Sequence, residues 1–220
     1  MNYNEINEVL SSLNKKSKLK KKKSCFLFGT TKKRINQNYY LTPNRESQKT
    51  IYAGAILNGN RIAKKLAKKI DGKVNYLFVD VEKKSTNKKD ILTNIERVTK
   101  GTIKKSIVKN YKPNDITVDS IENFIQDYFR KNLRGVGGKK ILILGSGNIG
   151  SKIAIRLLES GGNIFLFRRN KNKLKKISEV LNIIKPKHTK SRSNTISSNK
   201  LKFEDYDVII GCSDNEIKFK

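Results

Sequence analysis

The chain has 220 residues, enough for one or two domains with a sizeable core. Lys and Arg outnumber Asp and Glu by 49 to 19, and the net charge is +30, but the excess is mainly Lys spread over the whole chain. With His188 as the one histidine and Cys25 and Cys212 as the two cysteines, the composition argues against a zinc site, a disulfide framework and a Ser-His-Asp triad. Neither a membrane span nor a signal-peptide core is recognisable, so we expect a cytoplasmic protein with metal-free chemistry.

The first half of the chain predicts an N-terminal helix followed by alternating strands and helices. Ile6, Val9, Leu10 and Leu13 fall at helical spacing, and this helix docks either on the body of the protein or on a second subunit, which leaves a homo-oligomer open. The Lys-rich stretch 15–23 is either a solvated connector or an arm that binds polyanions. The expected elements beyond it are strands at 25–28 and 39–41, a helix from about 60 to 71, a strand at 74–81, a helix around 91–98 and a strand at 103–108. The last strand, helix and strand form a β-α-β unit, so these two strands should be parallel and close together.

A helix is expected to link the two halves. Asp119 with Glu122 three positions later resembles a capping box at its start. The residues expected on its apolar face are Ile121, Phe124, Ile125, Tyr128, Phe129 and Leu133. The glycine-rich stretch 134–138 then predicts a hinge.

A glycine turn follows the hinge, and it sits between a strand and a helix. The apolar run 141–144 ends at Gly145, and the stretch Gly145-Ser146-Gly147-Asn148-Ile149-Gly150 fits the pattern G-x-G-x-x-G. In this motif the glycines allow a tight turn, a close approach of backbone to a pyrophosphate and a close contact between helix and strand. A helix then runs to the glycine pair 161–162, and 164–167 form a second strand. The stretch predicts a Rossmann-type dinucleotide site, against the alternative of a Rossmann-like domain that binds nothing.

The end of the second strand indicates which dinucleotide is bound. NAD enzymes usually carry Asp or Glu there to accept the ribose hydroxyls, whereas this chain has Arg168, Arg169 and Asn170. Two guanidinium groups suit a 2′-phosphate, so NADP is favoured over NAD. The alternative is that a chain rich in Lys and Arg carries basic residues here by composition alone.

The remaining residues predict an abbreviated sheet. A helix from about 171 should bury Leu174, Ile177, Val180 and Leu181, and 185–200 should form a mobile loop or an irregular replacement for a strand. A strand in 206–214 ends at Cys212 and Ser213, which could border a nicotinamide. A doubly wound domain normally has further strands, so the sheet is abbreviated, is completed by another chain, or belongs to a fragment.

These features resemble the two-domain dehydrogenases that include shikimate dehydrogenase and the methylenetetrahydrofolate dehydrogenases. Leu157-Leu-Glu-Ser-Gly161 and Arg168-Arg-Asn170 are similar to shikimate dehydrogenase motifs in the same register, and the family's NADP-binding arginine would be Arg169. The resemblance implies that a Lys and an Asp handle the proton of the reacting hydroxyl, and the nearest equivalents here are Lys84, or its neighbour Lys83, and Asp119. The proline of the family's Lys motif and its serine-rich substrate motif are absent, so shikimate itself is a doubtful substrate.

The sequence thus predicts an α/β protein in which a smaller α/β domain precedes a Rossmann-type parallel sheet. The expected segments are 1–23 (helix and connector), 24–115 (substrate domain), 116–138 (linking helix and hinge) and 139–220 (NAD(P)-binding domain). The favoured function is an NADP-dependent oxidoreductase that acts on a small metabolite in a cleft between the domains. The alternatives are a non-catalytic nucleotide sensor or partner protein and a nucleic-acid-binding protein. The few aromatic residues are not interleaved with basic ones, which weakens the nucleic-acid alternative. No membrane partner is expected.

Overall fold

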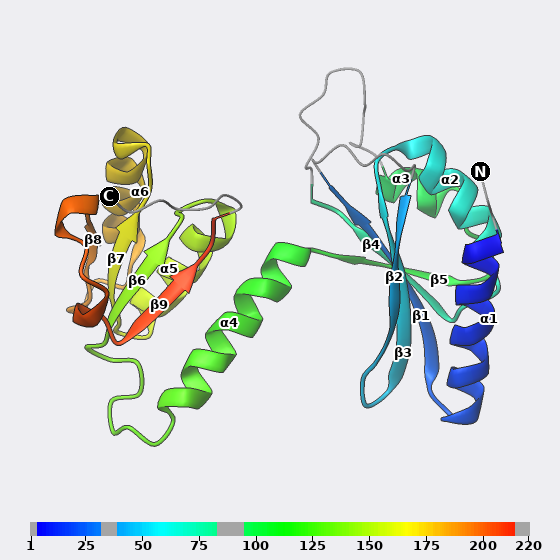
Figure 1. The fold of residues 1–220 in the computed structure, drawn as a ribbon, viewed down its shortest axis with the longest axis horizontal. Helices are drawn as coiled ribbons and strands as arrows, with labels where there is room; N and C mark the ends of the chain where they lie inside the picture. Colours follow the sequence, from blue (N-terminus) through cyan, green and yellow to red (C-terminus); the bar gives the residue numbers. More distant parts are fainter. Residues whose placement is uncertain (1–3, 32–38, 83–94, 214–220) are drawn as a thin grey trace. The chain divides into compact units, whose positions relative to one another are not determined.

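The computed structural model describes residues 4–31, 39–82 and 95–213, and it shows an α/β chain divided into two compact units (Figure 1). Unit 1 comprises Met1–Pro113 and unit 2 comprises Asn114–Lys220. Each unit has its own sheet and its own hydrophobic core. None of the helices in the described ranges is long and apolar enough to cross a membrane.

Unit 1 is built on a five-stranded sheet in the order β2-β3-β1-β4-β5. Its β2 runs antiparallel to β3, and the other neighbouring strands are parallel. The elements are α1 (Asn4–Leu19), β1 (Lys23–Thr30), β2 (Tyr39–Glu46), β3 (Thr50–Leu57), α2 (Asn60–Ile70), β4 (Tyr76–Asp80), α3 (Ile95–Lys100) and β5 (Ile107–Tyr111). The predicted parallel pairing of the last two strands is confirmed, because β4 pairs with β5.

The helices of unit 1 cover one face of this sheet. Alternate residues of the central strands, among them Phe26 and Phe28 of β1, are buried in one cluster with apolar residues of α1, α2 and α3. The residues between them, such as Leu27 and Phe78, are only half buried. A strand turns successive side chains to opposite faces, so the second face of the sheet is the one that remains accessible.

Several sequence predictions for unit 1 need correction. The strand β3 was not predicted, and β5 begins at Ile107 rather than at 103. Part of the Lys-rich stretch 15–23 is helical, because α1 continues to Leu19. Lysine is a good helix former and is favoured near the negative end of the helix dipole, which explains the longer helix.

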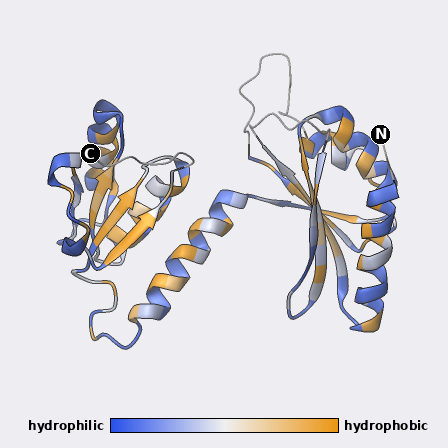
Figure 2. Ribbon diagram, viewed as in Figure 1, coloured by the Kyte–Doolittle hydropathy of each residue, from blue (hydrophilic) through white to orange (hydrophobic). Residues whose placement is uncertain are grey.

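Unit 2 is built on a four-stranded parallel sheet in the order β8-β7-β6-β9. The elements are α4 (Pro113–Phe129), β6 (Lys140–Leu144), α5 (Asn148–Glu159), β7 (Asn163–Phe167), α6 (Lys171–Ile184), β8 (Ser193–Thr195), β9 (Val208–Gly211) and two 3-10 turns at Ser198–Lys200 and Phe203–Asp205. Figure 2 shows β6, β7 and β9 as hydrophobic along most of their length. Such continuous apolar strands are typical of a parallel sheet inside an α/β unit.

The strand order of unit 2 is that of a Rossmann-type sheet. Numbered along the chain, the strands lie side by side in the order third, second, first, fourth. The second and third strands are added on one side of β6 and the fourth on the other, so the strand order reverses between β6 and β9. The stretch expected to be a loop or an irregular strand contains β8, which is the third of these strands. The carboxyl ends of β6 and β9 therefore meet at the position where such sheets bind ligands.

The helix α4 begins earlier than predicted, and it buries only part of the predicted apolar face. It begins at Pro113, six residues before the expected capping box, and proline suits the first turn because its missing N–H would be unpaired there. Val118, Ile125 and Phe129 are buried, but Phe124 is 73% exposed. Tyr128 and Leu133 of the predicted apolar face are exposed as well, and in α6 the predicted core residue Val180 is 52% exposed.

Candidate functional site

Two glycines of the turn after β6 are required by the chain's own packing. Gly145 has a φ of +105°, and a Cβ there would lie 2.8 Å from the carbonyl oxygen of Cys212. A Cβ on Gly150 would lie 2.0 Å from the carbonyl oxygen of Gly145. Both distances are far below van der Waals contact, so the strand, the turn and α5 can approach only if these two positions lack side chains.

The third glycine is not required by packing. Gly147 precedes α5 as its N-cap residue, with φ −84° and ψ −155°, and a Cβ there would meet nothing within 4 Å. Gly147 has no side chain to cap the helix, so among the described residues the first N–H groups of α5 point out of its amino end without a side-chain cap. Gly147 and Asn148 are both exposed. The turn is thus open at the helix N-terminus, where backbone dipoles favour an anion.

Arg168 is held against this turn. Its Nη1 donates a hydrogen bond to the carbonyl oxygen of Ser146 at 2.8 Å, from the end of the neighbouring strand β7. The hydroxyl of Ser151 donates to the same carbonyl at 3.4 Å. The side-chain oxygen of Ser146 is buried and has no hydrogen-bond partner among the described residues. A permanent positive charge therefore lies beside the open turn, and the exposed Arg169 follows it in the chain.

The other predicted cofactor residues take up different places around the turn. Ile149 is partly buried against the core of unit 2. Asn170 caps α6, because its Oδ1 accepts the N–H of Lys173 at 2.9 Å. Cys212 follows β9 and donates its N–H to the carbonyl of Leu144 at 2.8 Å, which holds the two strand ends together. Burial raises the pKa of the Cys212 thiol, so it stays protonated near neutral pH. Ser213, next in the chain, is exposed.

The structure gives Asp119 a contact within unit 2. Its carboxylate lies on α4 and accepts a hydrogen bond from Nη1 of Arg156 at 2.5 Å, and Glu122 accepts from the same atom at 2.7 Å. The hydrogen bonds that Arg156 donates to Glu122 and Asp119 raise its pKa. These contacts dock α4 on α5. Lys83 and Lys84, the other members of the predicted catalytic pair, lie outside the described residues.

A pocket of about 310 Å³ lies on the accessible face of the unit 1 sheet, at the carboxyl ends of its parallel strands. Polar and charged groups from all five strands line it, namely Thr30, Arg45, Tyr52, Asp80 and Tyr111. Asp80 is 2% exposed, and its Oδ2 accepts from the backbone N–H of Thr30 at 3.1 Å and from the Thr30 hydroxyl at 2.7 Å. Such a set of groups suits a small polar ligand.

Sequence reasoning did not identify these residues as site residues. Burial, together with the charges of Asp80 and Glu82, raises the pKa of Tyr111 well above its usual range, so its phenol can donate a hydrogen bond but not act as a base. The one available signal was an aspartate directly after the apolar strand residues 77–79, because polar residues at the carboxyl ends of parallel strands commonly line sites. Within the described ranges, no group of three or more His, Cys, Asp or Glu side chains could hold a metal ion.

Comparison with known proteins supports the description of unit 2. Residues 140–217 match the family described as NADP oxidoreductase, coenzyme F420-dependent. No curated protein matches the chain. L-tryptophan dehydrogenase from Nostoc punctiforme is similar in structure, with 13% identity, a TM-score of 0.49, and coverage of 87% of this chain and 56% of that one.

Two other solved structures are also similar to the chain. The A chain of dipicolinate synthase from Bacillus subtilis has 16% identity and a TM-score of 0.35, covering 84% of this chain and 53% of that chain. The catalytic subunit of aspartate transcarbamoylase from M. Jannaschii has 12% identity and a TM-score of 0.40, covering 96% and 70% respectively. The chain spans little more than half the length of the first two proteins. The family match makes residues 140–217 similar to NADP oxidoreductases, and the resemblance to shikimate dehydrogenases is supported only at the level of a Rossmann-type oxidoreductase.

Proposed function

We propose that the chain is an NADP-dependent oxidoreductase whose unit 2 binds the dinucleotide at the turn 145–150. The observation that carries the proposal is the open position at Gly147. Packing explains why Gly145 and Gly150 lack side chains, but it does not explain Gly147, where a Cβ would meet nothing within 4 Å. A diphosphate that lies against the backbone at this position supplies the missing reason.

The arrangement around the turn fits NADP. The free amide groups at the start of α5 would bind the diphosphate, and Arg168 with Arg169 would bind the 2′-phosphate. Cys212 and Ser213 would border the nicotinamide, from the end of β9 that lies against Gly145. When bound, the nicotinamide supplies hydride transfer. The contribution of these residues is to bind it and orient it.

We place the substrate in the pocket of unit 1 that contains Arg45, Asp80 and Tyr111. The guanidinium of Arg45 suits a carboxylate or phosphate of the substrate, and the phenol of Tyr111 suits a carbonyl or hydroxyl oxygen. A group must also take up or return the proton of the reacting oxygen. Lys84, with Lys83 as its alternative, follows Asp80 closely in the chain, and its pairing with Asp119 stays a prediction.

Titration with NADPH and with NADH, followed by nicotinamide fluorescence, tests the cofactor proposal. The double variant Arg168→Ala/Arg169→Ala should weaken NADPH by about tenfold or more, because charge-assisted hydrogen bonds to the 2′-phosphate are lost, and should change NADH little. Arg134→Ala/Arg192→Ala is a matched control, since both arginines are exposed on unit 2 and the same charge is removed. Equal weakening of both nucleotides would refute the choice of NADP.

A non-catalytic NADP sensor is the second candidate, and the contacts of Asp119 favour it. An aspartate engaged by Arg156 is less available to take a proton from a substrate. Hydride exchange between NADPH and a panel of small 2-oxo and 3-oxo acids separates the two candidates. Turnover that disappears in Asp80→Asn and Lys84→Gln variants supports the enzyme, and tight NADPH binding with no exchange on any member supports the sensor. If neither NADPH nor NADH binds, both candidates are rejected.

A further inference from the structure

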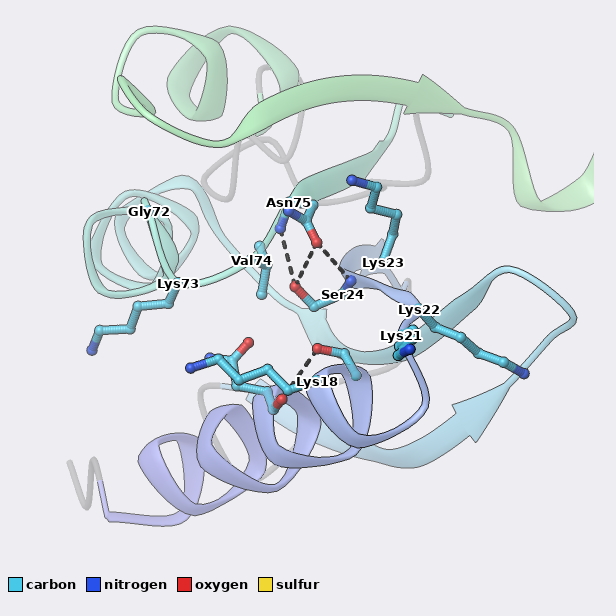
Figure 3. A pocket seen from close by; sticks show the side chains of 11 residues that line it. Lys18, Lys21, Lys22, Lys23, Ser24, Gly72, Lys73, Val74 and Asn75 are labelled. Carbon is cyan, nitrogen blue, oxygen red and sulfur yellow. Dashed lines mark hydrogen bonds between the residues drawn. The ribbon is translucent and has the colours of Figure 1, made fainter.

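A large basic pocket lies at the opposite edge of the unit 1 sheet, where β1 and β4 begin (Figure 3). Its volume is about 660 Å³, and it is enclosed by the last turns of α1, the start of β1 and the stretch that leads into β4. Five of its 11 lining residues are lysines, and none is Asp or Glu. The lysines are Lys18, Lys21, Lys22, Lys23 and Lys73.

Four of these five lysines form no ion pair with the residues that the structure describes. Within the described ranges, only Lys22 of the five forms an ion pair, with Glu46 at 2.6 Å. Asp71, the acidic residue next to Gly72 in the chain, accepts the backbone N–H groups of Lys104, Lys105 and Ser106 instead. Figure 3 shows the side chains of Lys22, Lys23 and Lys73 extending in different directions from the segments that line the pocket.

Ser24 and Asn75 line the pocket with polar groups that are hydrogen-bonded to each other. Oδ1 of Asn75 accepts from the backbone N–H of Ser24 at 2.9 Å and from its hydroxyl at 3.1 Å. This fixes the orientation of the amide, and its NH₂ group donates to no other group in the part of the chain that the structure describes. The NH₂ group of Asn75 is therefore a neutral donor in a pocket lined by ammonium groups, and both kinds of donor bind phosphate oxygens.

The backbone at Lys21 provides an independent observation. Lys21 is the one described non-glycine residue with positive φ, at +52°. The chain leaves α1 here in a Schellman motif, with Lys22 N–H bonded to Ser17 O at 2.9 Å and Lys21 N–H bonded to Lys18 O at 3.2 Å. Glycine adopts this conformation at less cost. A lysine at a strained position on the rim of a basic pocket points to a role for its ammonium group.

We propose that this pocket binds a small molecule that carries several phosphate charges. The lysines come from the continuous stretch 18–23 and from Lys73, and their position around a concave space favours a compact ligand over an extended polymer. No aromatic residue lines the pocket, so it has no platform for the stacked bases of single-stranded nucleic acid. The ligand would link the end of α1 to the start of β4, at the edge of the sheet away from Asp80 and Tyr111.

Calorimetric titration of the full chain with inorganic triphosphate tests this proposal. Lys18→Gln/Lys23→Gln/Lys73→Gln should raise the Kd for triphosphate by about tenfold or more, because three positive charges that attract it are lost. The matched control is Lys64→Gln/Lys65→Gln/Lys68→Gln, which removes the same charge from exposed positions of α2 that do not line the pocket. Triphosphate should also raise the melting temperature of the native chain and of the control, and not that of the pocket variant.

Two single variants sharpen the result. Lys21→Gly should weaken triphosphate without lowering the melting temperature of the free protein, because glycine suits the positive φ. Glu46→Gln should strengthen triphosphate binding by about twofold, because Lys22 is released from its ion pair. Equal losses in the pocket and control variants would overturn the proposal, since they would mean binding to the overall net charge. Duplex DNA binding that the pocket variant lowers while triphosphate affinity stays unchanged would overturn it too.

Discussion

The three glycines of the turn at 145–150 should respond differently to alanine. Gly147→Ala should leave the free energy of unfolding within about 0.5 kcal/mol of the native value, because a methyl group there meets no neighbour. It should nevertheless weaken NADPH strongly, because the methyl group would stand where the diphosphate approaches the backbone. Gly150→Ala should destabilise unit 2 by about 1–3 kcal/mol or more, because its Cβ would overlap the carbonyl of Gly145. Urea unfolding and NADPH titration of both variants measure the two effects.

Gly59→Ala provides the control for this experiment. Gly59 is also an N-cap glycine without a side-chain cap and with nothing within 4 Å of a Cβ, but it precedes α2 in unit 1. The variant should leave NADPH binding unchanged. If Gly147→Ala binds NADPH as tightly as the native chain, the open position is not where the cofactor lies, and the proposed function loses its main support.

The sequence predicted the strand, turn and helix around 145–150 because many of the constraints on the turn are local, although the contact of Gly145 with Cys212 is not. Positive φ at Gly145 and the close approach at Gly150 both arise within one strand, turn and helix. The environment of Asp119 could not be read in the same way, because its partner Arg156 lies 37 positions further along the chain. The partners Thr30 and Asp80 are 50 positions apart, and they meet only because β1 and β4 are neighbours in the sheet.

At the scale of elements, the docking of α4 on unit 2 should depend on its buried face. Ile125 is 5% exposed and Ile116 on the same helix is 53% exposed. Ile125→Ala should therefore lower the free energy of unfolding of unit 2 by about 2–5 kcal/mol. Ile116→Ala, the same chemical change, should lower it by no more than about 0.5 kcal/mol. Chemical denaturation followed by circular dichroism compares them, and equal losses would mean that the assigned face of α4 is wrong.

The element that sequence reasoning missed shows where periodicity fails. The strand β3 contains Gly54 and two alanines, residues with low strand propensity. In the folded sheet β3 lies between β1 and β2, and a Cβ at Gly54 would lie 2.8 Å from the carbonyl of Leu27. Small residues thus allow close packing at the centre of the sheet. That requirement comes from the neighbouring strands, so it is not visible in the segment itself.

The contact between the end of α1 and the end of β2 should depend on pH. Hydrogen bonds from Lys20 and Lys22 lower the pKa of Glu46 from 4.5 to about 2. A carboxyl group with a lowered pKa in the folded state contributes stability that is fully present above its unfolded pKa. This contribution should be lost as the pH falls from about 4.5 to about 2. The urea midpoints of the native chain and Glu46→Gln should therefore differ above pH 5 and converge in acid, and a constant difference would contradict the assignment.

At the scale of the whole molecule, the proposed cofactor site and the proposed substrate pocket lie in different units, and each unit has its own core. The residues assigned to the cofactor, from Gly145 to Ser213, all belong to unit 2, whose core is formed by its own sheet and by α4, α5 and α6. The two pockets described in unit 1 are formed by that unit alone. The sequence predicted the parallel sheet of unit 2 and the parallel pairing of β4 with β5 in unit 1, but it assigned α4 to a linker rather than to the core of unit 2.

Residues 114–220 expressed alone should therefore fold cooperatively and bind NADPH with a Kd within about threefold of the full chain, because a unit with its own core folds independently. A matched fragment of residues 139–220 lacks α4 and with it the buried side chains of Val118, Ile125 and Phe129. It should unfold at a lower urea concentration than the longer fragment, because the stabilising burial of this apolar surface is lost. If the longer fragment folds but does not bind NADPH, residues of unit 1 must complete the cofactor site. The proposal that the turn at 145–150 and the two arginines suffice would then be wrong.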